Sequence, residues 1–156
     1  MILVTLGTHP QPMDRLVGWV DGLIADGTVD AATIQAAAFG RRPEHARAID
    51  IVGVDELAAL MDAAARIVTH GGPGSILQVL ARGRRPIVVP RDPSLGEHVD
   101  DHQQRFVAWL ADRRDIAVAT SLGDLRAALA EPDVVRAPGG PGGAAVERIR
   151  ALLEGR

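Results

Sequence analysis

The sequence predicts an α/β fold in which helices cover both faces of a parallel β-sheet. Short β-type runs alternate with stretches whose apolar residues recur at helical spacing. The connections between them are short, and 156 residues leave room for one domain with its own core. In sheets of this kind, ligands bind beyond the carboxyl ends of the strands. The loops that follow Leu6, Val52, Thr69 and Pro90 are therefore the places to examine for function.

The predicted strands are short runs of mostly aliphatic residues. They are expected at residues 2–6, 33–38, 48–52, 66–69, 86–89 and 116–119. Apolar residues at helical spacing predict helices over residues 12–24, 57–64, 75–82, 99–110 and 121–129. Pro12 suits a first helical turn, Gly83 suits a helix end, and Ser121 suits an N-terminal cap.

The composition changes near residue 133. We expect residues 1–132 to form the domain, residues 133–143 to be a linker rich in glycine and proline, and residues 144–156 to form a terminal helix. One apolar stripe runs along that helix and would pack either on its own domain or on another chain. The sequence leaves both arrangements open.

Composition and charge exclude several functional classes. The net charge of −3 gives no reason to expect a nucleic acid or an anionic membrane surface as a partner. Cysteine is absent, which excludes disulfides, thiolate nucleophiles and cysteine-ligated zinc. All 17 basic residues are arginine, so a lysine Schiff base is excluded too. The N-terminus lacks a basic leader and no run is long enough to span a bilayer, so we expect a cytoplasmic protein.

The stretch THGGPGSILQ, residues 69–78, joins a predicted strand to a predicted helix. Its glycines let the backbone approach a ligand closely, and a helix N-terminus offers N–H groups to an anion. His70 and Ser75 would add side-chain donors. The alternative is a plain turn, because Ser75 and Gln78 have the spacing of a capping box. The stretch alone leaves both interpretations open.

A second polar stretch, GEHVDDHQQ at residues 96–104, is expected to open a helix after another strand-end loop. Its carboxylates, imidazoles and amides suit hydrogen bonding to a polyol such as a sugar. His98 and His102 have the i, i+4 spacing of helical metal ligands, but no third ligand suggests itself and we expect no metal. The alternative is a solvated acidic helix start that would explain Glu97 and Asp100 without a ligand.

The third stretch, GTHPQP at residues 7–12, follows the first predicted strand and lies on the same rim. His9 there is either a surface residue or a proton acceptor near a bound ligand, and both stay open because histidine titrates near neutrality. A G-x-S-x-G nucleophile elbow, a dinucleotide fingerprint and a Walker motif are absent.

Together, VTLGTHPQPMDRLV, IVTHGGPGSILQVLARGRRPIVVPR and GEHVDDHQ resemble glycosyltransferase family 28 C-terminal domains. The likeness covers residues 1 to about 130 and is strongest to small exopolysaccharide glycosyltransferase subunits and to the catalytic subunit of the dolichol-linked N-acetylglucosaminyltransferase. It implies a Rossmann-like domain that forms the donor-binding half of a GT-B enzyme. A UDP-sugar would be the donor substrate, with no further cofactor and no metal.

The resemblance also implies which residues contact the donor. The diphosphate would lie against the glycine turn, the ribose against Gln78 and the uracil against the loop at Gly53 and Val54. Family members of the plant type carry glutamate where this chain has Gln78, so ribose binding is expected to be weaker. The remaining implied contacts to phosphates and sugar are Gly7, Thr8, His9, His70, Gly71, Gly72, Gly74, Ser75, Asp101, Gln103 and Gln104.

The resemblance implies an inverting, metal-independent transfer to a lipid-linked acceptor. The N–H groups of the turn, the helix dipole and an imidazolium at His70 would stabilise the leaving diphosphate, and His9 is the candidate catalytic residue. One GT-B half lacks an acceptor domain, so a membrane-anchored partner subunit would supply it and hold the chain at the inner membrane face. Three alternatives stay open: a homodimer of the isolated chain, a non-catalytic nucleotide-sugar-binding module, and a UDP-sugar epimerase, for which the chain is short.

Overall fold

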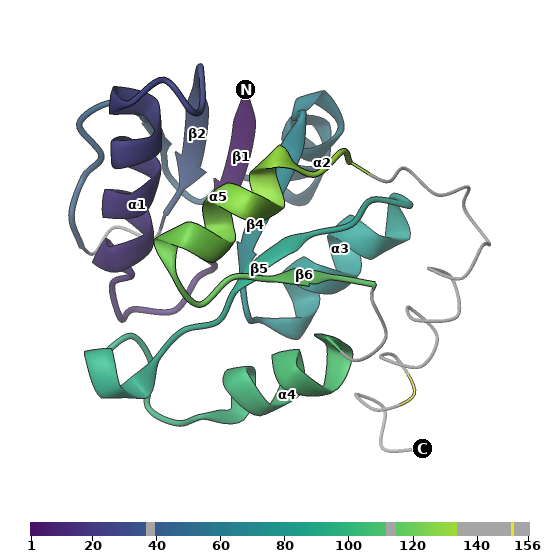
Figure 1. Cartoon of the computed structure of the whole chain (residues 1–156). Helices are drawn as coiled ribbons and strands as arrows, with labels where there is room; N and C mark the ends of the chain where they lie inside the picture. Colours follow the sequence, from purple (N-terminus) through teal and green to yellow (C-terminus); the bar gives the residue numbers. More distant parts are fainter. Residues whose placement is uncertain (37–39, 112–114, 134–150, 152–156) are drawn as a thin grey trace.

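The structure is a computed structural model that describes residues 1–36, 40–111, 115–133 and 151 (Figure 1). Within these residues, six parallel strands form one sheet in the order β3-β2-β1-β4-β5-β6. The strands are β1 Ile2–Thr5, β2 Ala32–Gln35, β3 Arg47–Ile49, β4 Arg66–His70, β5 Ile87–Val89 and β6 Ala117–Val118. The central strand β1 pairs with β2 and β4, the register placing Val4 between Ile34 and Val68. The predicted parallel sheet is therefore confirmed.

The helices lie in two layers, one on each face of this sheet. They are α1 Asp14–Ala25, α2 Val54–Ala63, α3 Pro73–Ala81, α4 His102–Ala111 and α5 Leu122–Ala130, with a short 3-10 turn at Pro93–Leu95. Helices α1 and α5 share a core with one face of the sheet, whereas α2 and α3 pack on the other face and α4 packs beside α3 (Figure 1). Helices on both faces were predicted, and they are confirmed.

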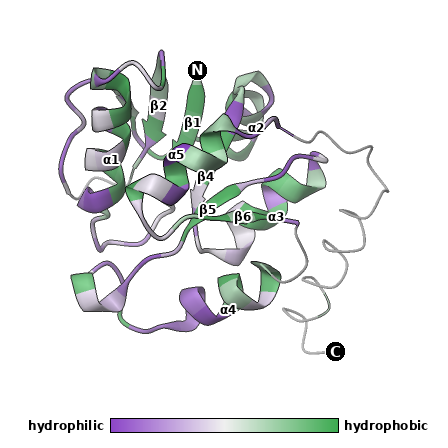
Figure 2. Ribbon diagram, in the orientation of Figure 1, coloured by the Kyte–Doolittle hydropathy of each residue, from purple (hydrophilic) through white to green (hydrophobic). Residues whose placement is uncertain are grey.

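The alternation of apolar side chains along each strand builds these two layers. Val4 of β1 packs with Leu16 of α1 and Leu125 of α5, whereas its neighbour Leu3 packs with Met61 of α2 and Val79 of α3. Central parallel strands are covered on both faces, which explains why β1, β4 and β5 are buried along their whole length and consist mostly of apolar residues (Figure 2). The carboxyl ends of β1, β4 and β5 thereby emerge side by side at one rim.

Several helices begin at residues other than those predicted. Helix α1 begins at Asp14 rather than residue 12, and α2 begins at Val54 rather than residue 57. Helix α3 begins at Pro73 rather than Ser75, because proline suits the first helical position and Gly72 takes the cap position with extended φ and ψ. Helix α4 begins at His102, whose N–H donates to Asp100, while Val99 lies outside it and is 72% exposed. The helix predicted over residues 99–110 therefore starts three residues later.

The other boundaries agree closely with prediction. Strand β2 begins at Ala32 and β3 covers Arg47–Ile49, each within a few residues of its predicted range. Gly83 follows α3 with a φ of 70°, and Ser121 caps α5 in a capping box with Asp124. The predicted linker and terminal helix, residues 133–143 and 144–156, lie almost wholly outside the described residues. None of the described helices is both long and apolar enough to cross a membrane.

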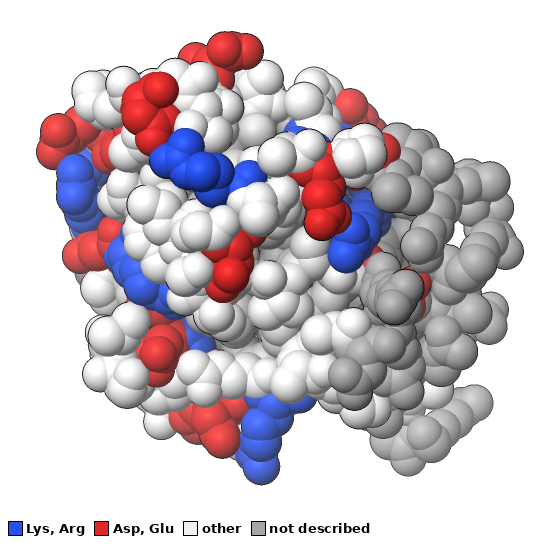
Figure 3. Space-filling view, viewed as in Figure 1, with Lys and Arg blue, Asp and Glu red and all other residues white. Residues whose placement is uncertain are grey.

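On the face shown in Figure 3, basic and acidic side chains are interspersed. Several charged side chains of the described residues form ion pairs, among them Arg126 with Asp26 and Arg85 with Glu131. Such exposed pairs contribute little to stability individually.

Candidate functional site

A cavity of about 310 Å³ opens at the carboxyl rim of the sheet, between the ends of β1, β2 and β4 and the starts of α2 and α3. Seven of the residues predicted to contact a ligand line it together: Gly7, Thr8, His70, Gly72, Gly74, Ser75 and Gln78. The structure thus brings the first-strand loop and the glycine turn to one place, as expected for strand-end loops of a parallel sheet.

The glycine turn leaves the N-terminus of α3 without a side-chain cap. Gly72 occupies the cap position, and no side chain there accepts a helical N–H. The capping box predicted for Ser75 and Gln78 is wrong, because Ser75 already lies inside the first helical turn. The N–H groups of this turn and the positive end of the helix dipole are therefore directed toward the cavity without a competing side chain.

His70 closes the inner wall of the cavity, and two glycines make room for it. Its side chain is buried at the end of β4, with 8% of the residue exposed. A Cβ on Gly7 would lie 2.5 Å from Cε1 of His70, and one on Gly72 would lie 2.3 Å from Nε2. Gly7 also has a φ of 72°, a conformation that favours glycine. The imidazole is therefore held between two backbone segments.

Burial and, to a smaller extent, the nearby positive charge of Arg91 lower the pKa of His70 to about 4. Nδ1 lies 3.4 Å from the carbonyl oxygen of Thr5, an atom that only accepts, so we assign the proton of the neutral ring to Nδ1. The imidazolium predicted at this position is wrong, because His70 is neutral near pH 7. The remaining nitrogen, Nε2, is then an acceptor beside Gly72.

His9 and His98 meet above the same rim. Their ring centroids lie 4.5 Å apart, and Nδ1 of His9 is buried with no hydrogen-bond partner among the described residues. His98 is in the loop before α4, so His98 and His102 do not lie one turn apart on a helix, although their spacing allowed it. Nδ1 of each instead contacts a carboxylate oxygen of Asp100, at 3.2 and 2.9 Å. No group of three or more histidine, aspartate or glutamate side chains in the described part could hold a metal ion.

The predicted sugar-contacting residues of the second polar stretch separate in space. Gln103 lies over the glycine turn, since a Cβ on Gly71 would be 3.0 Å from its Cβ. Its Oε1 is buried without a partner among the residues described. Gln104 hydrogen-bonds Asp92, and the exposed Asp101 pairs with Arg105 at 3.3 Å. None of the three lines the cavity.

At the other end of the rim, the two residues predicted to contact uracil lie just outside the cavity. Gly53 is the cap residue of α2, and Val54 is 75% exposed. Their neighbours Ile51, Val52 and Leu57 line the cavity instead and give it an apolar wall. Sequence reasoning missed these residues, although they adjoin the predicted loop.

A buried charged network, which the sequence reasoning also missed, supports the rim. Arg91, 1% exposed, donates to the carbonyl oxygens of Leu6 at 2.7 Å, Gln11 at 2.6 Å and Glu97 at 2.8 Å. Arg15 of α1 forms two hydrogen bonds to the carboxylate of Glu97, at 3.0 and 2.7 Å. Glu97 is 3% exposed, so the solvated helix start predicted for it is wrong. The sequence signal that could have indicated this network was Arg91, an arginine just after the apolar run of β5.

Comparison with known proteins places this fold. The model of the glycosyltransferase family 28 C-terminal domain matches residues 24–128. Among curated proteins, none matches the sequence. Similar solved structures include the glycosyltransferase SnogD from Streptomyces nogalater, with 22% identity and a TM-score of 0.51 over 96% of this chain. The glycotransferase of kitacinnamycin has 23% identity and a TM-score of 0.57 over 97% of this chain. The solution structure of ALG13 has 20% identity and a TM-score of 0.52 over 82% of each chain.

These likenesses also give the extent of the match. The chain spans 37% of the length of SnogD and of the kitacinnamycin enzyme, in keeping with the single half-domain that the sequence predicted. The family model covers residues 24–128, which include the glycine turn and the second polar stretch. With the six-stranded parallel sheet and its rim cavity, this match shows that the chain belongs to the glycosyltransferase family 28 C-terminal domain family.

Proposed function

We propose that this chain is the donor-binding catalytic subunit of a glycosyltransferase and that the rim cavity binds a UDP-sugar. The observation that carries the proposal is the uncapped start of α3, which faces a cavity whose backbone is bare at Gly72 and Gly74. N–H groups and a helix dipole at such a position bind phosphate groups. Membership of the family supports the same assignment.

The other walls of the cavity suit the remaining parts of the donor. The diphosphate would lie against residues 72–75, with the hydroxyl of Ser75 as an added donor. Gln78 lies one helical turn further along α3, within the cavity lining, where its amide can hydrogen-bond ribose hydroxyls. The apolar wall at Ile51 and Val52 suits the face of uracil, next to the predicted Gly53–Val54 loop.

The proposed reaction is a single displacement that inverts the anomeric carbon. The acceptor hydroxyl forms a bond to that carbon, its proton passes to a general base, and UDP leaves with the electron pair of the broken C–O bond. Because His70 is neutral, the developing charge on UDP would be stabilised by the N–H groups and dipole of α3 rather than by an imidazolium. His9, whose buried Nδ1 lacks a partner among the described residues, is the candidate base.

The acceptor and the partner complete the proposal. The chain spans 37% of the length of SnogD and of the kitacinnamycin enzyme. We propose that another subunit supplies the acceptor-binding half. We propose that this partner is membrane-anchored and presents a lipid-linked acceptor used for polysaccharide or glycolipid synthesis. The chain itself would then be cytoplasmic and peripheral to the membrane.

Two matched glycine variants test the donor site. A Cβ on Gly74 or on Gly22 of α1 would meet no atom within 4 Å, so both Gly74→Ala and Gly22→Ala should fold. Both add alanine to a helix and should leave stability unchanged or raise it by up to about 1 kcal/mol. Only Gly74→Ala places a methyl group where the diphosphate would lie. Calorimetry with UDP should show at least tenfold weaker binding for Gly74→Ala and unchanged binding for Gly22→Ala; equal affinities would remove the proposed diphosphate site.

A non-catalytic nucleotide-sugar-binding module is the alternative, and the amide at Gln78 favours it, because an amide cannot offer ribose two anionic acceptors. Both candidates bind UDP, so transfer activity distinguishes them. Transfer of labelled sugar by the chain together with its partner subunit supports the enzyme. UDP-sugar binding with no transfer in that complex supports the module.

A further inference from the structure

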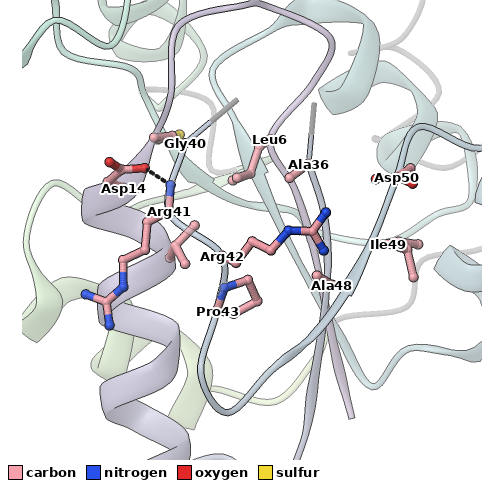
Figure 4. A pocket seen from close by; sticks show the side chains of 12 residues that line it. Leu6, Asp14, Ala36, Gly40, Arg41, Arg42, Pro43, Ala48, Ile49 and Asp50 are labelled. Atoms are coloured by element: carbon pink, nitrogen blue, oxygen red, sulfur yellow. Dashed lines mark hydrogen bonds between the residues drawn. The ribbon is translucent and has the colours of Figure 1, made fainter. Parts of the chain in front are cut away.

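A second cavity, of about 290 Å³, lies on the opposite face of the sheet from the first, between α1 and the ends of β2 and β3 (Figure 4). At the ends of β1 and β2, consecutive residues of the chain line different cavities. Leu6 and Ala36 line the second cavity, whereas Thr5, Gly7 and Gln35 line the first. The loop that connects β1 to α1 therefore borders both cavities, and it carries His9.

Residues 40–43 form a wall of this cavity, and two carboxylates of α1 hold the segment 40–45 in place. Asp14 accepts the backbone N–H of Arg41 at 2.7 Å, and Asp21 accepts those of Glu44 and His45 at 2.9 and 3.0 Å. Gly40 has a φ of 113°, and a Cβ there would lie 2.7 Å from a carboxylate oxygen of Asp14. These contacts fasten the wall to α1 without any ligand, so the cavity is preformed.

The cavity combines an apolar floor with one available guanidinium. Leu6, Met13 and Val17 of the floor are each at most 5% exposed. Arg41 is engaged at the rim, since it forms a hydrogen bond to Glu44 at 2.9 Å. Arg42 has no ion pair with any residue that the structure describes, and its guanidinium extends across the cavity (Figure 4).

Among the described residues, neither carboxylate of the lining, Asp14 or Asp50, forms an ion pair with that guanidinium. An oxygen of Asp14 is taken by the N–H of Arg41, and Asp50 lies beside Ile49 (Figure 4). An arginine fork over an apolar floor is suited to a phosphate attached to a hydrocarbon group.

We propose that this cavity binds the phosphate-bearing end of the acceptor, a phosphate or diphosphate group attached to an apolar stem. The inference rests on the proposed function, in which donor and acceptor must meet at the loop that carries His9. Arg42 would hold the anion, and the floor at Leu6, Met13 and Val17 would hold the first carbons of the stem. This chain, and not its partner alone, would then contribute to acceptor recognition.

The test uses geranyl diphosphate, inorganic diphosphate and geraniol as probes of the full chain. Each is titrated with saturating UDP present, so that the first cavity is blocked, and amide and methyl NMR shifts locate the binding. Geranyl diphosphate should shift residues around Val17, Ala36 and Ala48, and should bind at least tenfold more tightly than either fragment. Loss of one charge-assisted contact predicts at least tenfold weaker binding to Arg42→Gln.

The matched control is Arg47→Gln, which removes the same charge from an exposed arginine of β3 outside the lining of this cavity. It should bind geranyl diphosphate as the unmodified chain does. Equal affinity in Arg42→Gln and the unmodified chain, or shifts confined to the glycine turn, would overturn the proposal.

The failures of the two proposals are distinguishable. UDP should shift Gly72, Gly74 and Ser75, and the absence of those shifts removes the donor site while leaving the geranyl diphosphate result to decide the second cavity. Normal UDP shifts with no geranyl diphosphate binding remove the second site and leave the donor site standing.

Discussion

His70 is a buried histidine at the inner wall of the rim cavity. A histidine beside a glycine turn suggests a cation for a phosphate, but the ring lies buried between Gly7 and Gly72. Burial and the charge of Arg91 keep it neutral at pH 7. His70 therefore fixes the shape of the turn without adding a charge near pH 7. The proposed anion binding would then depend on backbone N–H groups, which do not titrate in this pH range.

This protonation state predicts a pH dependence of stability. The folded pKa of His70, about 4, lies below the ordinary value of 6.5, so the unfolded chain binds the proton more tightly. Stability is then full above pH 6.5 and is lost as the pH falls toward 4. Between pH 7 and pH 5 the free energy of unfolding should fall by about 2 kcal/mol. Urea unfolding at both pH values measures this fall.

The variant His70→Asn isolates the contribution of the imidazole, because it keeps a hydrogen-bond donor for Thr5 but cannot be protonated. It should lose most of the fall between pH 7 and pH 5. Carboxylates with lowered pKa values, such as Asp21 and Asp124, act mainly below this window. A fall of the same size in His70→Asn would show that His70 is not the group responsible.

At the scale of elements, the two helices that begin with serine in or near the first turn use it differently. Ser121 caps α5, accepting the N–H of Asp124 at 3.1 Å. Ser75 lies inside α3 and lines the cavity, and Gly72 takes the cap position without a side-chain bond. One serine therefore stabilises a helix start, and the other leaves the start open.

This difference predicts opposite effects for the same substitution. Ser121→Ala should lower the free energy of unfolding by about 1 kcal/mol, the usual cost of a lost cap, and leave UDP binding unchanged. Ser75→Ala should change stability by less than about 0.5 kcal/mol and weaken UDP binding, because it removes a donor to the diphosphate. Thermal unfolding and UDP calorimetry on both variants measure the four values. A stability loss in Ser75→Ala with normal UDP binding would restore a capping role to Ser75.

At the scale of the whole molecule, one half-domain carries both cavities. Arg91 ties the end of β5 to the loop after β1, and Glu97 ties the next loop to Arg15 of α1. These contacts hold the loops of the rim together, and the chain spans 37% of the length of SnogD and of the kitacinnamycin enzyme. Under the proposed function, the domain would bind the donor and another chain would complete the site for transfer.

The corresponding prediction concerns the isolated chain. Purified alone, it should bind UDP in calorimetry but show little transfer of labelled sugar to a lipid acceptor. Addition of the membrane-anchored partner should raise transfer at least a hundredfold, because proximity of two bound substrates accounts for a large part of catalysis. Efficient transfer by the isolated chain, with no partner added, would overturn the two-subunit proposal.

Much of the site could be predicted because strand-end loops of a parallel sheet share one rim. Gly7 is far from His70 and Ser75 in the sequence, yet all three line one cavity for that reason. Gln104 and Asp101 could not be placed, because their direction depends on where α4 begins. Asp100, by accepting the N–H of His102, moves that start three residues beyond the predicted one.

The sequence by itself determined the strand and helix order, the parallel sheet and the position of the glycine turn, since apolar periodicity and glycine placement are local properties. Only the tertiary structure decided the charge of His70, the burial of Glu97 and Arg91, and the cavity at Arg42. Each of these depends on which segments pack against a side chain, and packing sets its desolvation and its partners. Local patterns do not encode that environment, so chemistry at the rim follows from the fold.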